Sequence, residues 1–183
     1  MFAPEHIGAL AEASRRTKKI RRCVSIANFG GWTAAVFGAF SLLGLAFSFS
    51  LASLFITVAL GVVAWGEFRG AAMVRRFDPA GARRLALNQV VFGAALFIYS
   101  VWCLIQGLRG GGISSELASG NPEADAMIAN IGRMVNLALY GSLAVVAIVG
   151  PGLTAWSYAS REKLIRQFRD QTESSVVEAL KVA

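Results

Sequence analysis

The longest apolar segment lies between Arg22 and Glu67, where 44 consecutive residues carry no charged side chain. As a single helix this run would be about 66 Å long, roughly twice the 30 Å hydrocarbon core of a bilayer. We therefore expect the chain to reverse between Phe47 and Ser53, where three serines interrupt the large apolar residues and can bond a turning backbone. The pattern predicts two membrane helices joined by a tight turn.

Two further uncharged runs follow, one of 24 residues from Leu85 to Leu108 and one of 27 from Met134 to Ser160. Each is long enough for one crossing. The sequence thus predicts an all-α integral membrane protein, a four-transmembrane-helix bundle made of two helical hairpins with amphipathic helices at both cytoplasmic ends. The expected segments are a basic N-terminal helix over 1–28, spans near 29–48, 51–70, 85–107 and 133–158, an outer Gly/Ser-rich loop over 107–122, and an amphipathic C-terminal helix over 159–183.

Helix ends can also be placed from the sequence. Asp78 followed by Pro79 is typical of a helix start, because an aspartate caps free amides and proline suits the first turn. The second helix should therefore continue to about Phe77. Asn121 before Pro122 predicts another start, and Pro151 interrupts the last span, where it predicts a kink that is either static or a hinge.

The composition agrees with these spans, since 55% of residues are hydrophobic and only 16% are charged. The net charge of +7 is unevenly distributed. Sixteen of the 18 basic residues lie before the first span, between the second and third, or after the fourth, so the positive-inside rule places both termini in the cytoplasm and the 107–133 connection outside. A plasma or inner membrane is expected, and the charge does not indicate nucleic acid. The residues expected to meet anionic lipid headgroups are Arg15, Arg16, Lys18, Lys19, Arg21, Arg22, Arg75, Arg76, Arg83 and Arg84.

Small residues recur every three or four positions along the spans, and such stripes allow close helix approach in lipid. They predict contacts within the chain or with a neighbouring subunit. The predicted packing positions are Gly31, Ala34, Gly38, Ser41, Gly61, Gly66, Gly70 and Gly150.

Glu67 ends the long apolar run and has two interpretations. It is either a headgroup-level carboxylate paired with Arg69, Arg83 or Arg84, or a functional acid on an ion or proton path. The polar residues of the spans likewise either bond helices together or line a pore. The candidates for such a polar network or pore are Ser53, Thr57, Glu67, Asn88, Gln89, Asn136, Thr154 and Ser157.

Catalytic patterns are absent from the sequence. The one histidine, His6, lies near the N-terminus, and there is no CxxC pair, GxSxG motif or P-loop. We expect no catalytic residues, no bound metal and no cofactor. The leading functional hypothesis is therefore a non-enzymatic membrane component that acts by association, as a scaffold, accessory subunit or self-assembling complex. An oligomeric ion channel is the alternative, and a small transporter is the third hypothesis.

Overall fold

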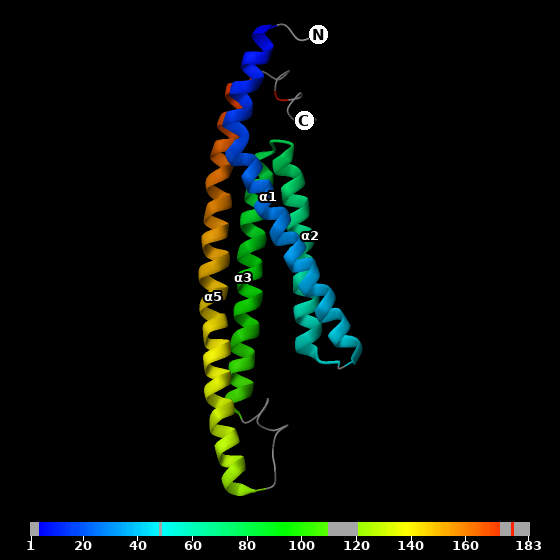
Figure 1. Ribbon diagram of the computed structural model, residues 1–183, viewed down its shortest axis with the longest axis vertical. Coiled ribbons are helices and arrows are strands. Elements are labelled where there is room, and N and C mark those ends of the chain that lie inside the picture. Colours follow the sequence, from blue (N-terminus) through cyan, green and yellow to red (C-terminus); the bar gives the residue numbers. More distant parts are fainter. Residues whose placement is uncertain (1–3, 48, 110–120, 173–176, 178–183) are drawn as a thin grey trace. The chain divides into compact units, whose positions relative to one another are not determined.

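The computed structural model describes residues 4–47, 49–109, 121–172 and 177, with side chains from Thr17 onward. This part of the chain is almost entirely helical and contains no strand (Figure 1). Its long helices are α1 (Pro4–Phe47), α2 (Leu51–Arg75), α3 (Pro79–Leu108) and α5 (Pro122–Gln171). The predicted all-helical class is confirmed. The fold divides into two units, residues 1–91 with 153–183 and residues 92–152, so that α3 and α5 each contribute to both.

Four helices are long and apolar enough to cross a membrane, over Thr17–Phe47, Leu51–Arg75, Pro79–Leu108 and Pro122–Gln171. Large apolar side chains remain exposed along them, including Phe47 at 91% and Trp156 at 74%. Because a water-soluble protein rarely exposes so much contiguous apolar surface, lipid is the solvent that fits these helices. Length and composition thus support the predicted membrane location.

The helices run further than the expected segments. α1 continues without a break from Pro4 through the basic residues and into the apolar run, and α5 continues from Pro122 to Gln171 through Pro151 (Figure 1). Extending an existing helix adds one hydrogen bond for each residue ordered, so a change from polar to apolar composition alone does not end it. The expected loop over 107–122 lies largely outside the described residues, as does most of the chain after residue 172.

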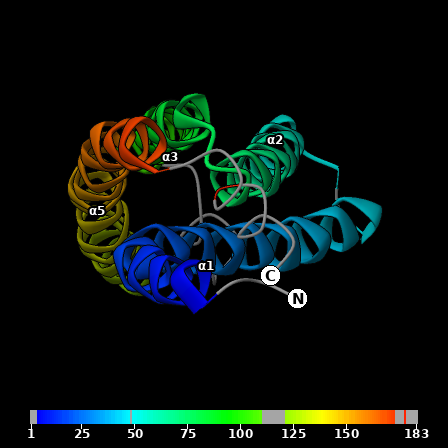
Figure 2. The same ribbon diagram turned by 90° about the horizontal axis from the view of Figure 1, so that it is seen from above.

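In the first unit, α1 and α2 pack against each other in opposite directions, because positions that come later on α1 contact positions that come earlier on α2. Figure 2 shows the two helices from above. An added Cβ at Gly31 would lie 3.0 Å from the Phe68 ring, and one at Gly38 would lie 3.4 Å from Leu60 Cβ. Near the turn, the Ser41 and Thr57 hydroxyls are 2.7 Å apart. The small side chains of α1 therefore allow its close approach to α2.

The serine-rich turn between α1 and α2 ends in a helix cap. Ser50 has an extended backbone, and its Oγ accepts a hydrogen bond from the Ser53 amide at 3.0 Å. This satisfies one of the free amides of the first turn of α2. The chain reversal expected between Phe47 and Ser53 therefore has a local physical basis.

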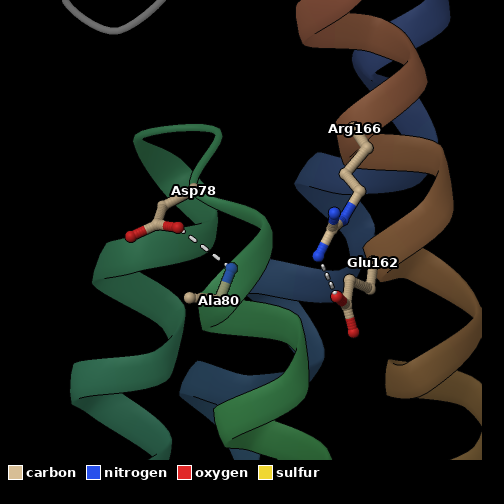
Figure 3. Close-up of polar contacts among 4 residues, drawn as sticks. All are labelled: Asp78, Ala80, Glu162 and Arg166. Atoms are coloured by element: carbon tan, nitrogen blue, oxygen red, sulfur yellow. Dashed lines mark hydrogen bonds and ion pairs between the residues drawn. The ribbon is translucent and has the colours of Figure 1, made fainter.

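The corner between α2 and α3 is a Schellman-type helix end. The Phe77 amide donates to the Val74 carbonyl and the Asp78 amide to the Met73 carbonyl, while Phe77 adopts a left-handed φ of 56°. α3 then begins at Pro79, and the Asp78 carboxylate accepts a bond from the Ala80 amide at 2.9 Å (Figure 3). Both the capping aspartate and the start at Pro79 agree with the sequence prediction.

Apolar side chains at this end of the first unit form its main buried core. Phe77 is 3% exposed and its ring centroid lies 5.1 Å from that of Phe168 on α5. Burial of the Phe77 ring explains why a bulky residue occupies a backbone conformation that favours glycine. The core brings together residues from all four helices, among them Ile20, Ala27, Val74, Leu85 and Ile165.

In the second unit, α3 and α5 approach closely at a proline. Pro151 has no amide hydrogen for the carbonyl of Ala147, four residues earlier, so that carbonyl lacks its usual helical donor. An added Cβ at Gly93 of α3 would lie 2.7 Å from this carbonyl oxygen and 3.0 Å from Pro151 Cβ. Pro151 therefore lies in a helix contact that only glycine fits, inside a helix that continues on both sides.

Candidate functional site

The most unusual polar group of the structure is Glu67 on α2, whose side chain is 0% exposed. Burying a carboxylate without partners is costly, so its surroundings must provide hydrogen-bond donors. They come from two other helices of the first unit. Asn88 and Gln89 are neighbours on α3, and Tyr158 lies on α5.

The two carboxylate oxygens of Glu67 receive different donors. Oε1 accepts from Asn88 Nδ2 at 2.9 Å and from Gln89 Nε2 at 2.8 Å. Oε2 accepts from the Tyr158 hydroxyl at 3.3 Å. The Asn88 amide nitrogen also donates to the Val63 carbonyl at 3.0 Å, so both of its hydrogens have acceptors on α2. We call Glu67, Asn88, Gln89 and Tyr158 the carboxylate cluster.

Close helix contacts flank the carboxylate cluster on two sides. On the α1 side, an added Cβ at Gly30 would lie 3.8 Å from Glu67 Oε2, and one at Gly31 would lie 3.2 Å from Glu67 Cβ. On the α3 side, an added Cβ at Gly66 would collide with the Asn88 amide. The predicted packing glycines 31 and 66 therefore lie where helix backbones approach this cluster, and Gly70 lies against Leu85 one turn further along α2.

The expected pairing of Glu67 with an arginine is wrong. Among the described residues, no lysine or arginine nitrogen lies within 4.0 Å of its carboxylate. Arg69 and Arg84 instead place their guanidinium carbons 5.4 and 5.1 Å from the centre of the Trp65 ring. The reason is the helical periodicity of α2, which places Glu67 and Trp65 on different sides of the helix. Glu67 is buried among the helices, whereas Trp65 is 56% exposed and its ring contacts the two arginines.

Glu67 itself has no exposed surface, although Gln89 of the carboxylate cluster is half-buried. Within the part of the chain that the structure describes, every buried side-chain nitrogen or oxygen has a hydrogen-bond partner. The same residues contain no group of three His, Cys, Asp or Glu side chains that could hold a metal ion. As arranged, the cluster fixes α2, α3 and α5 to one another.

Two other predicted polar residues lie on α2 at its contact with α1. Thr57 Oγ1 donates to the Ser53 carbonyl at 2.8 Å, so its hydrogen is used and Ser41 is the donor in their 2.7 Å contact. In the second unit, Asn136 Nδ2 donates to the Cys103 carbonyl at 3.4 Å. Within the first unit, the candidates on α2 and α3 form two groups, Glu67 with Asn88 and Gln89, and Ser53 with Thr57.

Thr154 and Ser157 line an open pocket of about 510 Å³ in the first unit. We call it the basic pocket, because Lys19 and Arg22 of α1 and Arg161 of α5 also line it. The remaining lining residues are Cys23, Ile26, Leu153 and Tyr158.

Sequence reasoning missed the roles of Tyr158 and Arg161. Tyr158 belongs to both the carboxylate cluster and the basic pocket, and Arg161 is the first charged residue after the last apolar run. The available signal was their position at a membrane boundary, where aromatic and basic residues are common. That signal does not identify a binding partner.

The other predicted packing and headgroup positions differ in their exposure and contacts. Ala34 is buried, whereas an added Cβ at Gly61 or Gly150 would meet no described heavy atom within 4 Å. Of the predicted headgroup residues, those with exposed side chains are Lys18, Lys19, Arg21, Arg22, Arg75, Arg76 and Arg83; Arg84 is half-buried, and the side chains of Arg15 and Arg16 lie outside the described part.

Comparison with known proteins finds no matching protein-family model, curated protein or solved structure. Functional assignment therefore depends on the physical properties of the chain itself.

Proposed function

We propose that this chain is a small non-enzymatic integral membrane protein that acts by helix–helix association, as a scaffold, accessory subunit or self-assembling complex. In this proposal the four spans form two hairpins, both termini are cytoplasmic, and the basic ends of α1 and α5 lie at the cytoplasmic membrane surface. The 107–133 connection lies outside.

The observation that carries the proposal is the closed state of Glu67. A catalytic or conducting carboxylate needs access to substrate, water or an ion path. Glu67 is instead 0% exposed, and its oxygens accept bonds from three side chains on α3 and α5. This favours a role in holding helices together over a role in chemistry or conduction.

The outer helix surfaces provide secondary support. An added Cβ would meet no described heavy atom within 4 Å at Gly44, Gly61, Gly141 or Gly152. Gly141 and Gly152 are eleven residues apart on α5, which is close to three helical turns and places them on one side. Small residues on a lipid-facing surface allow another helix to approach closely.

Photo-crosslinking in native membranes tests the proposal. A photoreactive amino acid would replace either Phe40 on α1 or Ile148 on α5, which are 66% and 60% exposed. We expect a protein adduct of discrete mass from at least one position. Lipid adducts alone at both positions would contradict association.

The channel alternative predicts a different result in reconstituted vesicles. We expect no ion flux from the purified chain under varied voltage, because each candidate lining group near Glu67 already has a partner within the chain. Flux that is abolished in Glu67→Gln would replace the association proposal with a channel.

A further inference from the structure

The basic pocket has a composition that the carboxylate cluster does not explain. Lys19 and Arg22 lie one helical turn apart on α1, and Arg161 reaches the same pocket from α5. Within the described residues, no carboxylate lies within 4.0 Å of these three cations. Glu162, the residue after Arg161, pairs instead with Arg166 at 2.8 Å (Figure 3). Among the described residues, the pocket therefore brings together three positive charges without a carboxylate in contact with them.

Part of the pocket lining is apolar. It includes Ile26, which is 46% exposed, and Leu153, which is 62% exposed. Ile26 follows Arg22, the last basic residue of α1, by one turn, and Leu153 precedes Arg161, the first basic residue after the last apolar run, by about two turns. The pocket thus crosses the change from charged to apolar sequence on both helices.

Hydroxyl side chains also line the pocket. Thr154, Ser157 and Tyr158 lie on α5 between Leu153 and Arg161 in the sequence, and the Tyr158 hydroxyl donates to Glu67. Hydroxyls and basic side chains together are the usual protein partners of phosphate oxygens. A ligand that fits the whole lining has an acidic, phosphate-containing head and a hydrocarbon body.

We propose that the basic pocket binds one anionic phospholipid. Its headgroup phosphate is held by Lys19, Arg22 and Arg161, with Ser157 as an additional donor, and its acyl chains lie along Ile26 and Leu153. Basic pockets between membrane helices at a cytoplasmic surface are suited to such headgroups. The lipid joins α1 to α5 beside Tyr158, and so beside the carboxylate cluster.

A soluble phosphate shares the headgroup chemistry but not the apolar contacts. Free phosphate would use the three cations and leave Ile26 and Leu153 without a role. Burying hydrocarbon adds affinity that inorganic phosphate cannot obtain. The experiment must therefore compare the two ligands directly.

Native mass spectrometry can measure lipid retained by the full chain. The protein is placed in vesicles of equal parts phosphatidylglycerol and phosphatidylcholine and is then released. We expect one phosphatidylglycerol to remain bound, with affinity reduced about fivefold by each of Lys19→Gln, Arg22→Gln and Arg161→Gln. The matched control removes the same charge at Arg75, Arg76 and Arg83, which do not line the pocket, and should retain the lipid.

Three results would overturn the proposal: equal retention of phosphatidylcholine, equal lipid loss in the control and pocket variants, or complete displacement of lipid by inorganic phosphate. If the charge variants fail to fold, Leu153→Trp fills the apolar part and keeps every cation. It should still weaken lipid retention.

Thermal unfolding of the unmodified protein gives an independent test, because phosphatidylglycerol should raise the melting temperature more than phosphatidylcholine does. Equal melting temperatures in the two lipids would also contradict the proposal.

Discussion

At the scale of single residues, Glu67 shows how an acid is tolerated inside an apolar bundle. Its oxygens accept hydrogen bonds from two side-chain amides and one hydroxyl on neighbouring helices, and these donors take the place of water. A buried donor or acceptor without a partner costs about 1–3 kcal/mol. The stability of the first unit should therefore depend on whether position 67 can still accept hydrogen bonds.

Replacing Glu67 with alanine should lower the free energy of unfolding by about 2–4 kcal/mol, because the Asn88 and Gln89 amides lose their shared acceptor. Glu67→Gln should cost less, since its carbonyl oxygen can still accept both bonds. Thermal unfolding in detergent measures the difference. Equal stability of Glu67→Ala and the unmodified protein would mean that the carboxylate cluster does not hold the helices together.

Gly66 and Gly61 provide a matched pair on one helix. Gly66→Ala should be destabilising because the added Cβ collides with the Asn88 amide and displaces it from Glu67. Gly61→Ala meets no described atom within 4 Å and should be neutral, or stabilising by up to about 1 kcal/mol through helix propensity. Melting temperatures of the two variants would decide this, and the reverse order would contradict a close contact between Gly66 and Asn88.

Phe77 combines a strained backbone with a buried ring. Glycine at this position would relieve about 1–2 kcal/mol of left-handed strain. Removing a buried phenylalanine ring costs about 3–5 kcal/mol, however, and the contact with Phe168 would be lost. We expect Phe77→Gly to unfold at a lower temperature than the unmodified protein but at a higher one than Phe77→Ala. A Phe77→Gly variant more stable than the unmodified chain would contradict the importance of the ring.

At the scale of helices, the sequence predicts the number of spans and several helix ends. Uncharged runs give four crossings because a charged side chain is costly in lipid. The start of α3 at Pro79 and that of α5 at Pro122 follow from the capping groups Asp78 and Asn121, whose side chains accept bonds from Ala80 and Glu123. Such signals are local, so they can be seen without knowing the fold.

The partners of Glu67 could not be predicted in the same way. They depend on how each helix is rotated about its axis, and helices that are apolar on most sides give little periodic signal for that rotation. The sequence placed Glu67 near three arginines, but Arg69 and Arg84 lie over Trp65 and the donors come from α3 and α5. The unbroken course of α1 from the basic residues into the apolar run was not predicted, because charge marks the membrane boundary and not the end of a helix.

The contact between α1 and α2 also contains one direct polar bond, from Ser41 to Thr57. In a double-mutant cycle of Ser41→Ala and Thr57→Val, we expect a coupling free energy of about 0.6 kcal/mol, the typical size for such bonds in membrane proteins. Unfolding in mixed micelles can measure this energy. A coupling of zero would indicate that these helices are held by shape alone.

At the scale of the whole molecule, the buried polar side chains of the described residues all have hydrogen-bond partners, whereas many large apolar side chains remain exposed. In the proposed function, some of these exposed helix surfaces contact another protein chain instead of lipid. The basic pocket adds a place where lipid composition would affect the same assembly.

The most direct test is the mass of the complex extracted from its native membrane in lipid nanodiscs, with every co-purifying chain identified. The chain alone has a mass of 19.4 kDa. Association predicts a larger, defined mass, from further copies or from other membrane chains in a fixed ratio. A species that contains one copy of 19.4 kDa and lipid alone would contradict the proposed function.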